Sequence, residues 1–436
     1  MQEKESNSGI RIAIIGGGAA GFFAAIRVKE RLPHASVDIY ERAQKVLAKV
    51  AITGGGRCNL TNSFQEVRSM EQVYPRGHRL MKRLLKEFGN IDVCRWFEDA
   101  GVRLVTQPDQ CVFPVSQDAM EIVNVLLSLI KHEKVNVRTG CRVSKIEDKA
   151  TDTERYRISF ATDAEGRTTP DIDADIVIVT TGGNPKRGGY SMLDGLDLEI
   201  IDPLPSLFSF NIGSPDCIGN PALQTRDREL SALMGTVVNG AVAGLAGTKF
   251  RAEGPLLITD WGVSGPAILK LSSYAARYLA ENQYKSRLVV NWLGEMNVND
   301  VLSMLTDFAS RNPQKQLSSI YPERFNSRLW SFLLGRAGLP ETKRWAELSR
   351  KGLNKLADTL TSDLYPVTGR NRFKGEFVTC GGVALSEIDP KTLESRKHPG
   401  LYFAGEVLDV DAITGGFNLQ AAWTMGYIVA NSVSRP

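Results

Sequence analysis

The chain has 436 residues, of which 42% are apolar and 23% are charged, and its 53 basic and 49 acidic side chains give a formal net charge of +4. At roughly 100–200 residues per domain, this length predicts two to four domains, and the composition excludes the fibrous and disordered classes. The net charge is too small to indicate nucleic acid as a partner by itself.

No targeting or membrane-spanning segment is recognisable. The opening MQEKESNSGI lacks the apolar stretch of a signal peptide, and no apolar run reaches the roughly 18 residues of a membrane span. The six cysteines form no CxxC pair, which disfavours a zinc site, a dithiol relay and a disulfide framework. We therefore expect a cytoplasmic protein that has no metal site and no membrane partner.

The segment 10–42 has the pattern of a nucleotide-binding βαβ unit. An apolar run over 10–15 predicts a buried parallel strand, and residues 22–31 predict a helix. Residues 37–41 predict a second strand. The sequence GGGAAG stands between the first strand and the helix, where a dinucleotide-binding GxGxxG turn belongs.

The three spaced glycines of this turn have separate expected roles. Gly16 allows a tight turn, Gly18 lets the backbone approach a pyrophosphate, and Gly21 lets the helix pack on the strand. The helix N-terminus offers free N–H groups and partial positive charge to the diphosphate. Glu41 ends the second strand, where a carboxylate accepts from adenosine ribose hydroxyls and repels a 2′-phosphate. We therefore do not expect NADP at this site.

The chain then alternates between helical and strand patterns. A glycine-rich loop without helical or strand periodicity is predicted over 50–62. Helices are predicted over 80–88, 92–100 and 119–132, and strands over 135–138, 142–146, 156–160 and 175–179. The first three of these strands are expected to form an antiparallel meander.

The pattern changes after about residue 189. Short strands punctuated by Gly and Pro are predicted over 198–212 and 235–258, followed by a helical block over about 297–360. One face of that block is expected to be core, at Phe325, Leu329, Phe332 and Leu333. A parallel strand returns over 401–404, and a last helix follows Gly415 and Gly416 as far as Ser432. The nucleotide fold is thus expected to be interrupted between residues 190 and 375.

The meander and the C-terminal glycines favour FAD over NAD. A simple NAD dehydrogenase continues with further βαβ units and a catalytic His, Lys or Tyr. A helix that begins after Gly416 would place positive potential near the pyrimidine ring of a flavin, which is negatively charged when reduced. No second GxGxxG follows a strand. Either NAD(P)H docks transiently over the flavin, or the electrons come directly from an organic substrate.

Three long strings, spread over most of the chain, match one known family. They are GGGRCNLTN at 54–62, GPLLITDWGVSGPAILKLSS at 254–273, and the stretch 378–426, which includes VTCGGVALSEIDP and LYFAGEVLDVDAITGGFNLQAAWTMG. On these strings the chain resembles the BaiN/RdsA-like NAD(P)/FAD-dependent oxidoreductases, a group of bacterial flavoproteins.

The resemblance implies an α/β fold in three parts. A discontinuous, Rossmann-like FAD-binding domain is expected over 1–190 and 375–436. A β-barrel-like insert is expected over 191–296 and 362–374, and a small helical subdomain within it over 297–361.

The resemblance also implies contacts to the cofactor. Residues 54–59 are expected to line the flavin, and Lys49 occupies the basic position of the family before that loop. The candidate cofactor-binding residues are Gly16, Gly18, Ala19, Ala20, Gly21, Glu41, Arg42, Lys49, Gly54, Gly55, Gly56, Arg57, Cys58, Asn59, Val143, Thr181, Gly182, Gly405, Glu406, Gly416, Asn418 and Leu419. Cys380 departs from the family, which usually has a small residue such as alanine there.

No side chain is expected to act as a nucleophile or strong acid, because a flavin transfers hydride through its own N5 atom. His34 and His398 are expected at the solvated surface, and Cys58 as a small packed side chain, with a redox role as the alternative. Arg57 is expected to hold the cofactor rather than the substrate. A solvated helix face, or alternatively a gate for an anionic ligand, is expected from the basic run Arg76, His78, Arg79, Lys82, Arg83 and Lys86.

The predicted function is an FAD-dependent oxidoreductase that transfers a hydride between the flavin and a small organic substrate or NAD(P)H. An amine or amino-acid oxidase that uses oxygen is one alternative. A tRNA-modifying flavoenzyme is disfavoured by the low net charge. A non-catalytic flavin sensor is disfavoured by the large insert, which could cap a substrate cavity. The expected partner is a small molecule, with no nucleic acid; the oligomeric state is left open.

Overall fold

The computed structural model describes residues 9–149, 155–162, 166–220, 225–371 and 378–433. The chain divides into two compact units, Met1–Pro205 with Phe377–Pro436, and Ser206–Glu376. The first unit therefore extends beyond the expected boundary at 190. The expected boundary at 375, with residues 372–374 of the insert, lies outside the described residues, as do residues 1–8. The helical block belongs to the second unit, and its separation as a third domain stays a prediction.

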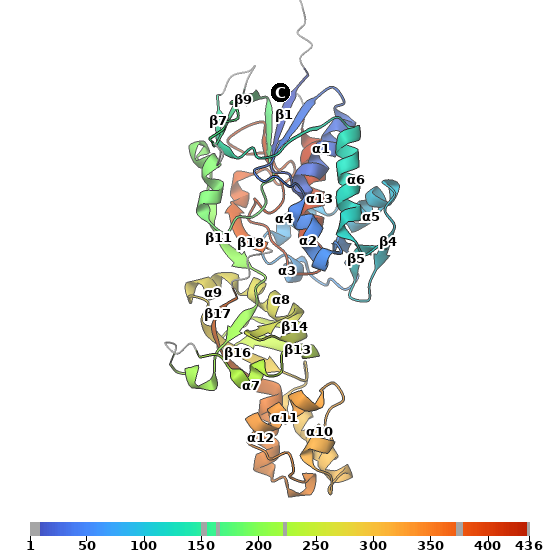
Figure 1. Ribbon diagram of the computed structural model, residues 1–436, viewed down its shortest axis with the longest axis vertical. Helices are drawn as coiled ribbons and strands as arrows, with labels where there is room; N and C mark the ends of the chain where they lie inside the picture. Colours follow the sequence, from blue (N-terminus) through green and yellow to red (C-terminus); the bar gives the residue numbers. More distant parts are fainter. Residues whose placement is uncertain (1–8, 150–154, 163–165, 221–224, 372–377, 434–436) are drawn as a thin grey trace, which may run out of the picture. The chain divides into compact units, whose positions relative to one another are not determined.

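A five-stranded parallel sheet with the order β19-β10-β1-β2-β6 forms the centre of the first unit (Figure 1). Its strands are β1 (Arg11–Ile15), β2 (Ser36–Tyr40), β6 (Asn136–Arg138), β10 (Ile176–Val179) and β19 (Leu401–Phe403). β10 pairs with β1 on one side and with β19 on the other, so the segments before and after the insert meet in one sheet. The Rossmann-type α/β fold is confirmed.

The strand β6 departs from the predicted topology. We expected it to begin an antiparallel meander, but it pairs in parallel with β2, with Asn136 opposite Asp38. The three-stranded antiparallel sheet consists instead of β7 (Val143–Asp148), β8 (Tyr156–Phe160) and β9 (Ile172–Ala174). A three-residue strand carries too few side chains for its periodicity to indicate which sheet it joins.

The helix α1 (Ala19–Arg31) packs against α13 (Phe417–Ser432) and α6 (Ala119–His132) (Figure 1). Gly426 permits the close approach of α13, since a Cβ there would lie 3.0 Å from the carbonyl oxygen of Ala20. The remaining elements of this unit are α2 (Ala48–Gly56), β3 (Thr61–Asn62), α3 (Met70–Val73), α4 (His78–Leu84), α5 (Asn90–Asp99), β4 (Leu104–Thr106), β5 (Cys111–Pro114), η1 (Arg187–Leu196), β11 (Ile200–Ser206), β18 (Val378–Val383) and η5 (Leu385–Glu387).

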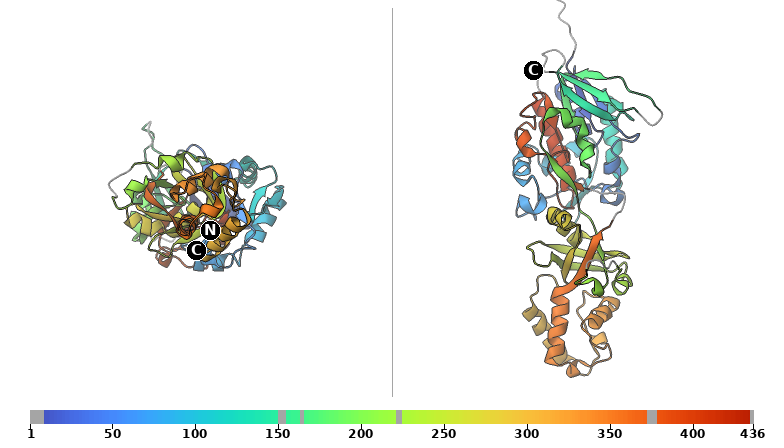
Figure 2. Two further views of the ribbon diagram at one scale, coloured as in Figure 1. Left: turned by 90° about the horizontal axis from the view of Figure 1, so that it is seen from below. Right: turned by 90° about the vertical axis from the view of Figure 1, so that its left-hand side faces the viewer.

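The second unit contains a closed barrel with the strand order β12-β15-β14-β13-β16-β17. Its strands are β12 (Phe210–Ile212), β13 (Val237–Leu245), β14 (Arg251–Ile258), β15 (Gly262–Ser264), β16 (Ser286–Asn291) and β17 (Asp363–Arg370). The helices are η2 (Pro215–Cys217), α7 (Arg228–Ser231), α8 (Pro266–Tyr274), α9 (Ala276–Glu281), α10 (Val298–Arg311), η3 (Leu317–Ser319), α11 (Ser327–Arg336), η4 (Trp345–Glu347) and α12 (Arg350–Ser362). Figure 2 shows α12 running directly into β17.

The expected core face of the helical block is partly correct. Leu329 and Leu333 are fully buried on α11, but Phe332 is only partly buried. Phe325 is buried although it precedes the helix, which Asn326 caps. Trp330 is also fully buried, and the predicted face did not include it.

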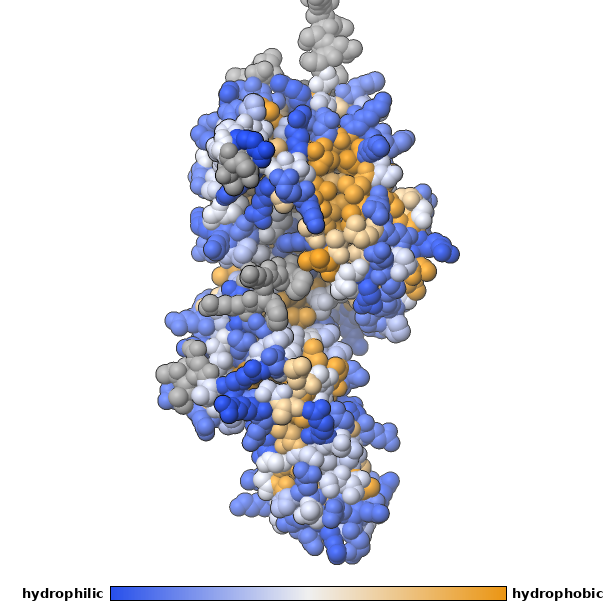
Figure 3. All heavy atoms as spheres, in the orientation of Figure 1, coloured by the Kyte–Doolittle hydropathy of each residue, from blue (hydrophilic) through white to orange (hydrophobic). Residues whose placement is uncertain are grey.

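The surface seen in Figure 3 is mostly hydrophilic, with an apolar area on the first unit in the region of α1 and α6. On α6, Met120 and Leu127 are exposed apolar side chains. Within the described ranges, no helix has both the length and the apolar character needed to cross a membrane.

Candidate cofactor-binding site

The predicted site residues follow the carboxyl ends of neighbouring parallel strands. Gly16 follows β1, Glu41 follows β2, Thr181 and Gly182 follow β10, and Gly405 follows β19. In a parallel sheet these ends lie on one edge. β2 and β6 lie on one side of β1, and β10 and β19, which come later in the chain, lie on the other side. Ligands of open α/β sheets bind in the crevice at such a change of direction, outside the carboxyl ends of the strands.

Two of the three spaced glycines of the GGGAAG turn lie against backbone atoms, and the third borders open space. A Cβ on Gly16 would lie 2.5 Å from the carbonyl oxygen of Thr180, and one on Gly21 would lie 2.2 Å from that of Gly16. A Cβ on Gly18 would meet no atom within 4 Å. Gly18 is also the N-cap of α1 and provides no side-chain cap. The first N–H groups of α1 therefore face a space that an anion can enter.

Glu41 lies beside this turn. Its Oε2 accepts from the N–H of Gly17 at 2.8 Å, and its Oε1 accepts from the N–H of Ala43 at 2.8 Å. The N–H of Cys141 donates to the Glu41 carbonyl at 2.9 Å, which brings the start of β7, including buried Val143, to the same end of β2. Each carboxylate oxygen keeps a further lone pair for a hydroxyl donor. Arg42, which follows, is exposed.

The segment 48–60 is partly helical, which corrects the expectation of a loop throughout. α2 begins at Ala48 and leaves helical geometry at Thr53, Gly54 and Gly55. The residues before Thr53 contain no glycine and complete a helical turn. Both of these glycines, and Gly56 after them, have positive φ. A Cβ on Gly55 or Gly56 would meet no atom within 4 Å, so this part of the backbone also borders open space.

Arg57 is fixed by contacts within the protein, and Cys58 is buried. The Nε of Arg57 donates to the Gly54 carbonyl at 3.1 Å, and its guanidinium lies 4.4 Å from the centre of the Phe113 ring. Cys58 is completely buried, and burial raises the pKa of its thiol to about 12. The thiol is therefore protonated and unreactive at neutral pH.

The N-terminus of α13, like that of α1, has no side-chain cap. Its N-cap is Gly416, with φ of 87°. With its amide oriented to satisfy both neighbours, Asn59 accepts from the N–H of Gly416 at 3.2 Å and donates to the Thr61 carbonyl at 3.0 Å. The amide of Asn418 both accepts from and donates to the backbone of Ala412, at 2.9 and 3.0 Å. Asn418 thus holds the preceding loop, and half-buried Leu419 follows it.

Lys49 and Glu406 form an ion pair of 3.2 Å that joins α2 to the end of β19. The other carboxylate oxygen of Glu406 accepts from the N–H of Thr379 at 2.5 Å. A Cβ on Gly182 would lie 4.0 Å from Lys49 Nζ, and one on Gly405 would lie 3.3 Å from the Ala20 Cβ. The structure thus brings five predicted residues together here: Ala20, Lys49, Gly182, Gly405 and Glu406.

Comparison with known protein families shows to which family the chain belongs. Residues 10–432 match the family described as HI0933-like protein Rossmann domain. The chain belongs to this family. The match confirms the resemblance to the BaiN/RdsA-like flavoprotein oxidoreductases, and the chain is a flavoprotein oxidoreductase of the HI0933-like family.

Two related proteins match along nearly their whole length. The chain is 28% identical over 440 residues to a 3-dehydro-bile acid delta(4,6)-reductase of Clostridium scindens, covering 97% of this chain and 99% of the relative. It is 27% identical over 428 residues to a ribosomal RNA dihydrouridine synthase of Haemophilus influenzae, covering 97% and 98%. A solved 3-ketosteroid-delta4-(5alpha)-dehydrogenase from Rhodococcus jostii RHA1 shares 12% identity over 98% of each chain, with a TM-score of 0.49.

The residues that support the loop before α13 were missed by sequence reasoning. The Arg76 guanidinium forms a two-pronged ion pair with Asp411, and the two side chains are 11% and 0% exposed. We expected Arg76 to lie on a solvated helix face. That expectation is wrong, because the side chain is held in this ion pair. The hydroxyl of Tyr74 donates to the Phe417 carbonyl at 2.9 Å. An acid within the apolar string VLDVDAI indicates a buried partner, but the partner lies 335 residues away and no spacing reveals it.

His398 also departs from its expected position. His34 is exposed as expected. The His398 side chain is only 17% exposed, with Nδ1 2.9 Å from an oxygen of Asp148 and Nε2 2.8 Å from the Leu196 carbonyl. It joins three segments of the first unit and has a structural role.

Proposed function

We propose that the protein is an FAD-dependent reductase that transfers a hydride from the flavin to a small organic substrate, with NAD(P)H as the electron donor. The observation that carries this proposal is the open space beside Gly18 at the N-terminus of α1, with the Glu41 carboxylate next to it. A helix N-terminus and an adjacent carboxylate are suited to a diphosphate and an adenosine ribose.

The residues present fit FAD. The first N–H groups of α1 would bind the diphosphate, and Glu41 would accept from the ribose hydroxyls. The N-terminus of α13 has no acidic residue in its first turn and directs positive potential at any group beyond Gly416. That potential would stabilise negative charge on the pyrimidine part of the flavin.

When bound, FAD supplies the hydride transfer itself. The contribution of the chain is binding, orientation and charge. Lys49 places a cation beside Glu406 at the end of β19, and Glu406 in turn holds the N–H of Thr379. Arg57 is stacked on Phe113 and presents a fixed cation on the glycine loop. Cys58 is buried and protonated, so a thiol step is not part of the proposal.

The direction of the reaction is supported by the relatives. A delta(4,6)-reductase and a dihydrouridine synthase are both named for adding hydrogen across a carbon–carbon double bond. We therefore propose an activated carbon–carbon double bond, conjugated to a carbonyl group, as the reducible part of the substrate.

Modification of RNA is the second candidate. Relatives named for ribosomal RNA match at 27% identity over nearly the whole of this chain, and their match supports this second candidate. The small-molecule substrate is supported by the bile-acid reductase, at 28% identity.

Anaerobic reduction of the FAD-loaded protein tests the proposal. NADH, NADPH and a panel of amines are added separately, and the visible flavin band is followed. We expect one dinucleotide to bleach the band and a steroid with a 3-oxo-4-ene group to restore it. Bleaching by an amine alone would indicate the oxidase instead. Restoration by ribosomal RNA and not by the steroid would indicate the second candidate.

A further inference from the structure

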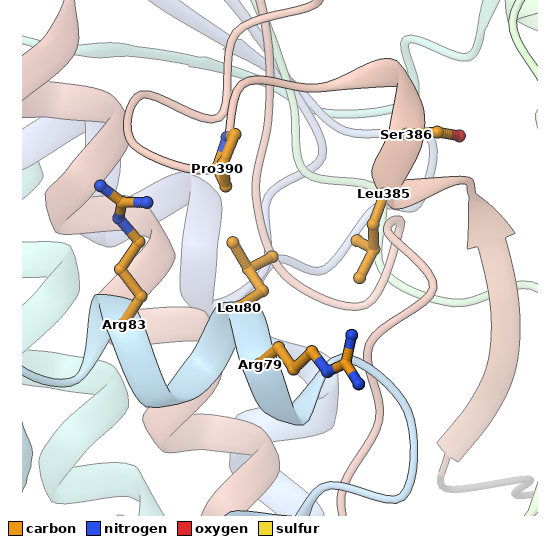
Figure 4. A pocket seen from close by; sticks show the side chains of 6 residues that line it. All are labelled: Arg79, Leu80, Arg83, Leu385, Ser386 and Pro390. Atoms are coloured by element: carbon orange, nitrogen blue, oxygen red, sulfur yellow. The ribbon is translucent and has the colours of Figure 1, made fainter.

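A pocket of about 590 Å³ lies on α4 of the first unit. Arg79, Leu80 and Arg83 line it from α4. Leu385 and Pro390 line it from the segment after β18. Figure 4 shows the two arginines on either side of Leu80, whose side chain faces Leu385. The remaining lining residue, Ser386, points away from them.

The pocket combines two cations with apolar walls. Arg79 and Arg83 are exposed and one helical turn apart, and in the described part of the chain neither guanidinium has an ion pair or hydrogen bond. Among the acids nearby, Asp389 accepts from the N–H of Lys391 at 2.7 Å, and Glu199 accepts from the Ser386 hydroxyl at 3.4 Å. Figure 4 shows the two guanidinium groups pointing apart, so each can bind a separate phosphate with charge-assisted hydrogen bonds, and the apolar side chains between them can cover a flat ring.

We propose that this pocket binds the phosphorylated adenosine part of the nicotinamide dinucleotide that reduces the flavin, an inference that rests on the proposed function. The chain has no second GxGxxG turn after a strand, so the donor must bind at a site that this motif does not identify. The one fingerprint site carries Glu41, whose charge repels a 2′-phosphate. The pocket supplies the opposite charge on a surface that the FAD site does not use.

The position of α4 supports this role. The residue before it, Gly77, contacts Val410, to which a Cβ on the glycine would approach within 2.6 Å. Arg76 is paired with Asp411 in the same loop, which leads to the N-terminus of α13. Arg79 follows Gly77 by two residues, a rise of about 3 Å along the helix. A donor held at Arg79 is thus close to the loop that precedes the proposed flavin-binding end of α13.

Calorimetric titration of the FAD-loaded full chain with 2′,5′-ADP and 5′-ADP tests the pocket without any redox step. The variants are Arg79→Gln and Arg83→Gln, with Lys82→Gln as the matched control. Lys82 is exposed on the same helix and carries the same charge, but it does not line the pocket. Loss of a charge-assisted hydrogen bond predicts at least about tenfold weaker binding in each arginine variant. The lysine variant should stay within about twofold of the parent protein.

Steady-state reduction by NADH or NADPH then tests the donor. The arginine variants should raise KM with little change in kcat, because uniform binding is lost. Absence of binding of both nucleotides at millimolar concentration would overturn the proposal, as would equal losses in Lys82→Gln. An unchanged KM in variants that bind 2′,5′-ADP more weakly would overturn the donor role. If 2′,5′-ADP binds as expected but neither dinucleotide reduces the flavin, the proposed function fails and the donor role fails with it.

Discussion

Glu41 is the side chain through which the adenosine end of FAD is most directly tested. Glu41→Ala removes a carboxylate that accepts from the N–H groups of Gly17 and Ala43 and that would accept from the ribose. A charge-assisted hydrogen bond contributes about 1.5–3 kcal/mol, so FAD should bind about 10- to 100-fold more weakly. Titration of apo-protein by flavin fluorescence quenching measures this. FMN affinity is the internal control, since FMN has no adenosine; an equal loss for both flavins would show that the change only disorders the turn.

Cys58 is predicted to be chemically silent. Burial raises its pKa to about 12, so at pH 8 the folded protein keeps it as a thiol. This pKa lies above the roughly 8.5 of a free thiol. The contribution of Cys58 to the free energy of unfolding is therefore complete below about pH 8.5 and is lost as the pH rises toward 12. Iodoacetamide at pH 8, with peptide mapping, should label half-exposed Cys141 and spare Cys58. Cys58→Ser with Cys380→Ser should still bind FAD and be reduced; complete loss of reduction with FAD bound would reveal a redox thiol.

Single residues were predictable from sequence where a local pattern fixes their role. Gly21 could be assigned from GxGxxG because its close contact, to the Gly16 carbonyl oxygen, lies within the strand–turn–helix, and Gly16 could be assigned because the turn gives it a φ of 115°. His398 could not be assigned, because its partners Asp148 and Leu196 are 250 and 202 residues away. A pairing of that separation depends on the completed fold.

The loop before α13 is held by a buried ion pair between Arg76 and Asp411, so a mutation there should destabilise it. Arg76→Gln removes the cation that pairs with the buried Asp411 carboxylate, which costs about 3–5 kcal/mol of unfolding free energy. The double variant Arg76→Leu, Asp411→Leu removes both charges and should recover part of this loss. Urea unfolding followed by tryptophan fluorescence measures both. A single variant as stable as the parent protein would mean that the ion pair is solvated and does not hold the loop.

Whole elements were predicted best where they are long and strongly patterned. The helix over 119–132 and the strand–turn–helix at the N-terminus agree with α6, β1 and α1. The short elements failed for a physical reason. The single helical turn of α2 precedes three glycines that dominate the local pattern, and β6 has only three residues. Side-chain periodicity cannot choose a sheet for such a strand.

At the scale of the whole molecule, FAD should stabilise one unit and not the other. The glycine turn, Glu41 and the N-termini of α1 and α13 belong to the unit made of Met1–Pro205 and Phe377–Pro436. A ligand at 100 times its Kd adds about 2.7 kcal/mol to the unit that binds it. Differential scanning calorimetry of the apo-protein should show two transitions, of which FAD raises only one. A single transition, or equal shifts of both transitions, would contradict this expectation.

The division into units could be predicted only in outline. The return of a parallel strand over 401–404 indicated an interrupted sheet, and β19 does pair with β10. The sequence did not indicate where the first unit gives way to the second. β11 pairs with β18 across the insert, and this pairing keeps residues up to Pro205 in the first unit. Pairing of strands far apart in the chain again depends on the completed fold.

The central claim is that this Rossmann-type unit holds FAD, and identification of the released flavin tests it most directly. The purified protein, reconstituted with a mixture of FAD and FMN and freed of excess flavin, is denatured, and the supernatant is separated by chromatography. The Glu41 carboxylate and the open N-terminus of α1 predict FAD, in a ratio of one per chain. A supernatant that contains only FMN, or no flavin, would contradict the account.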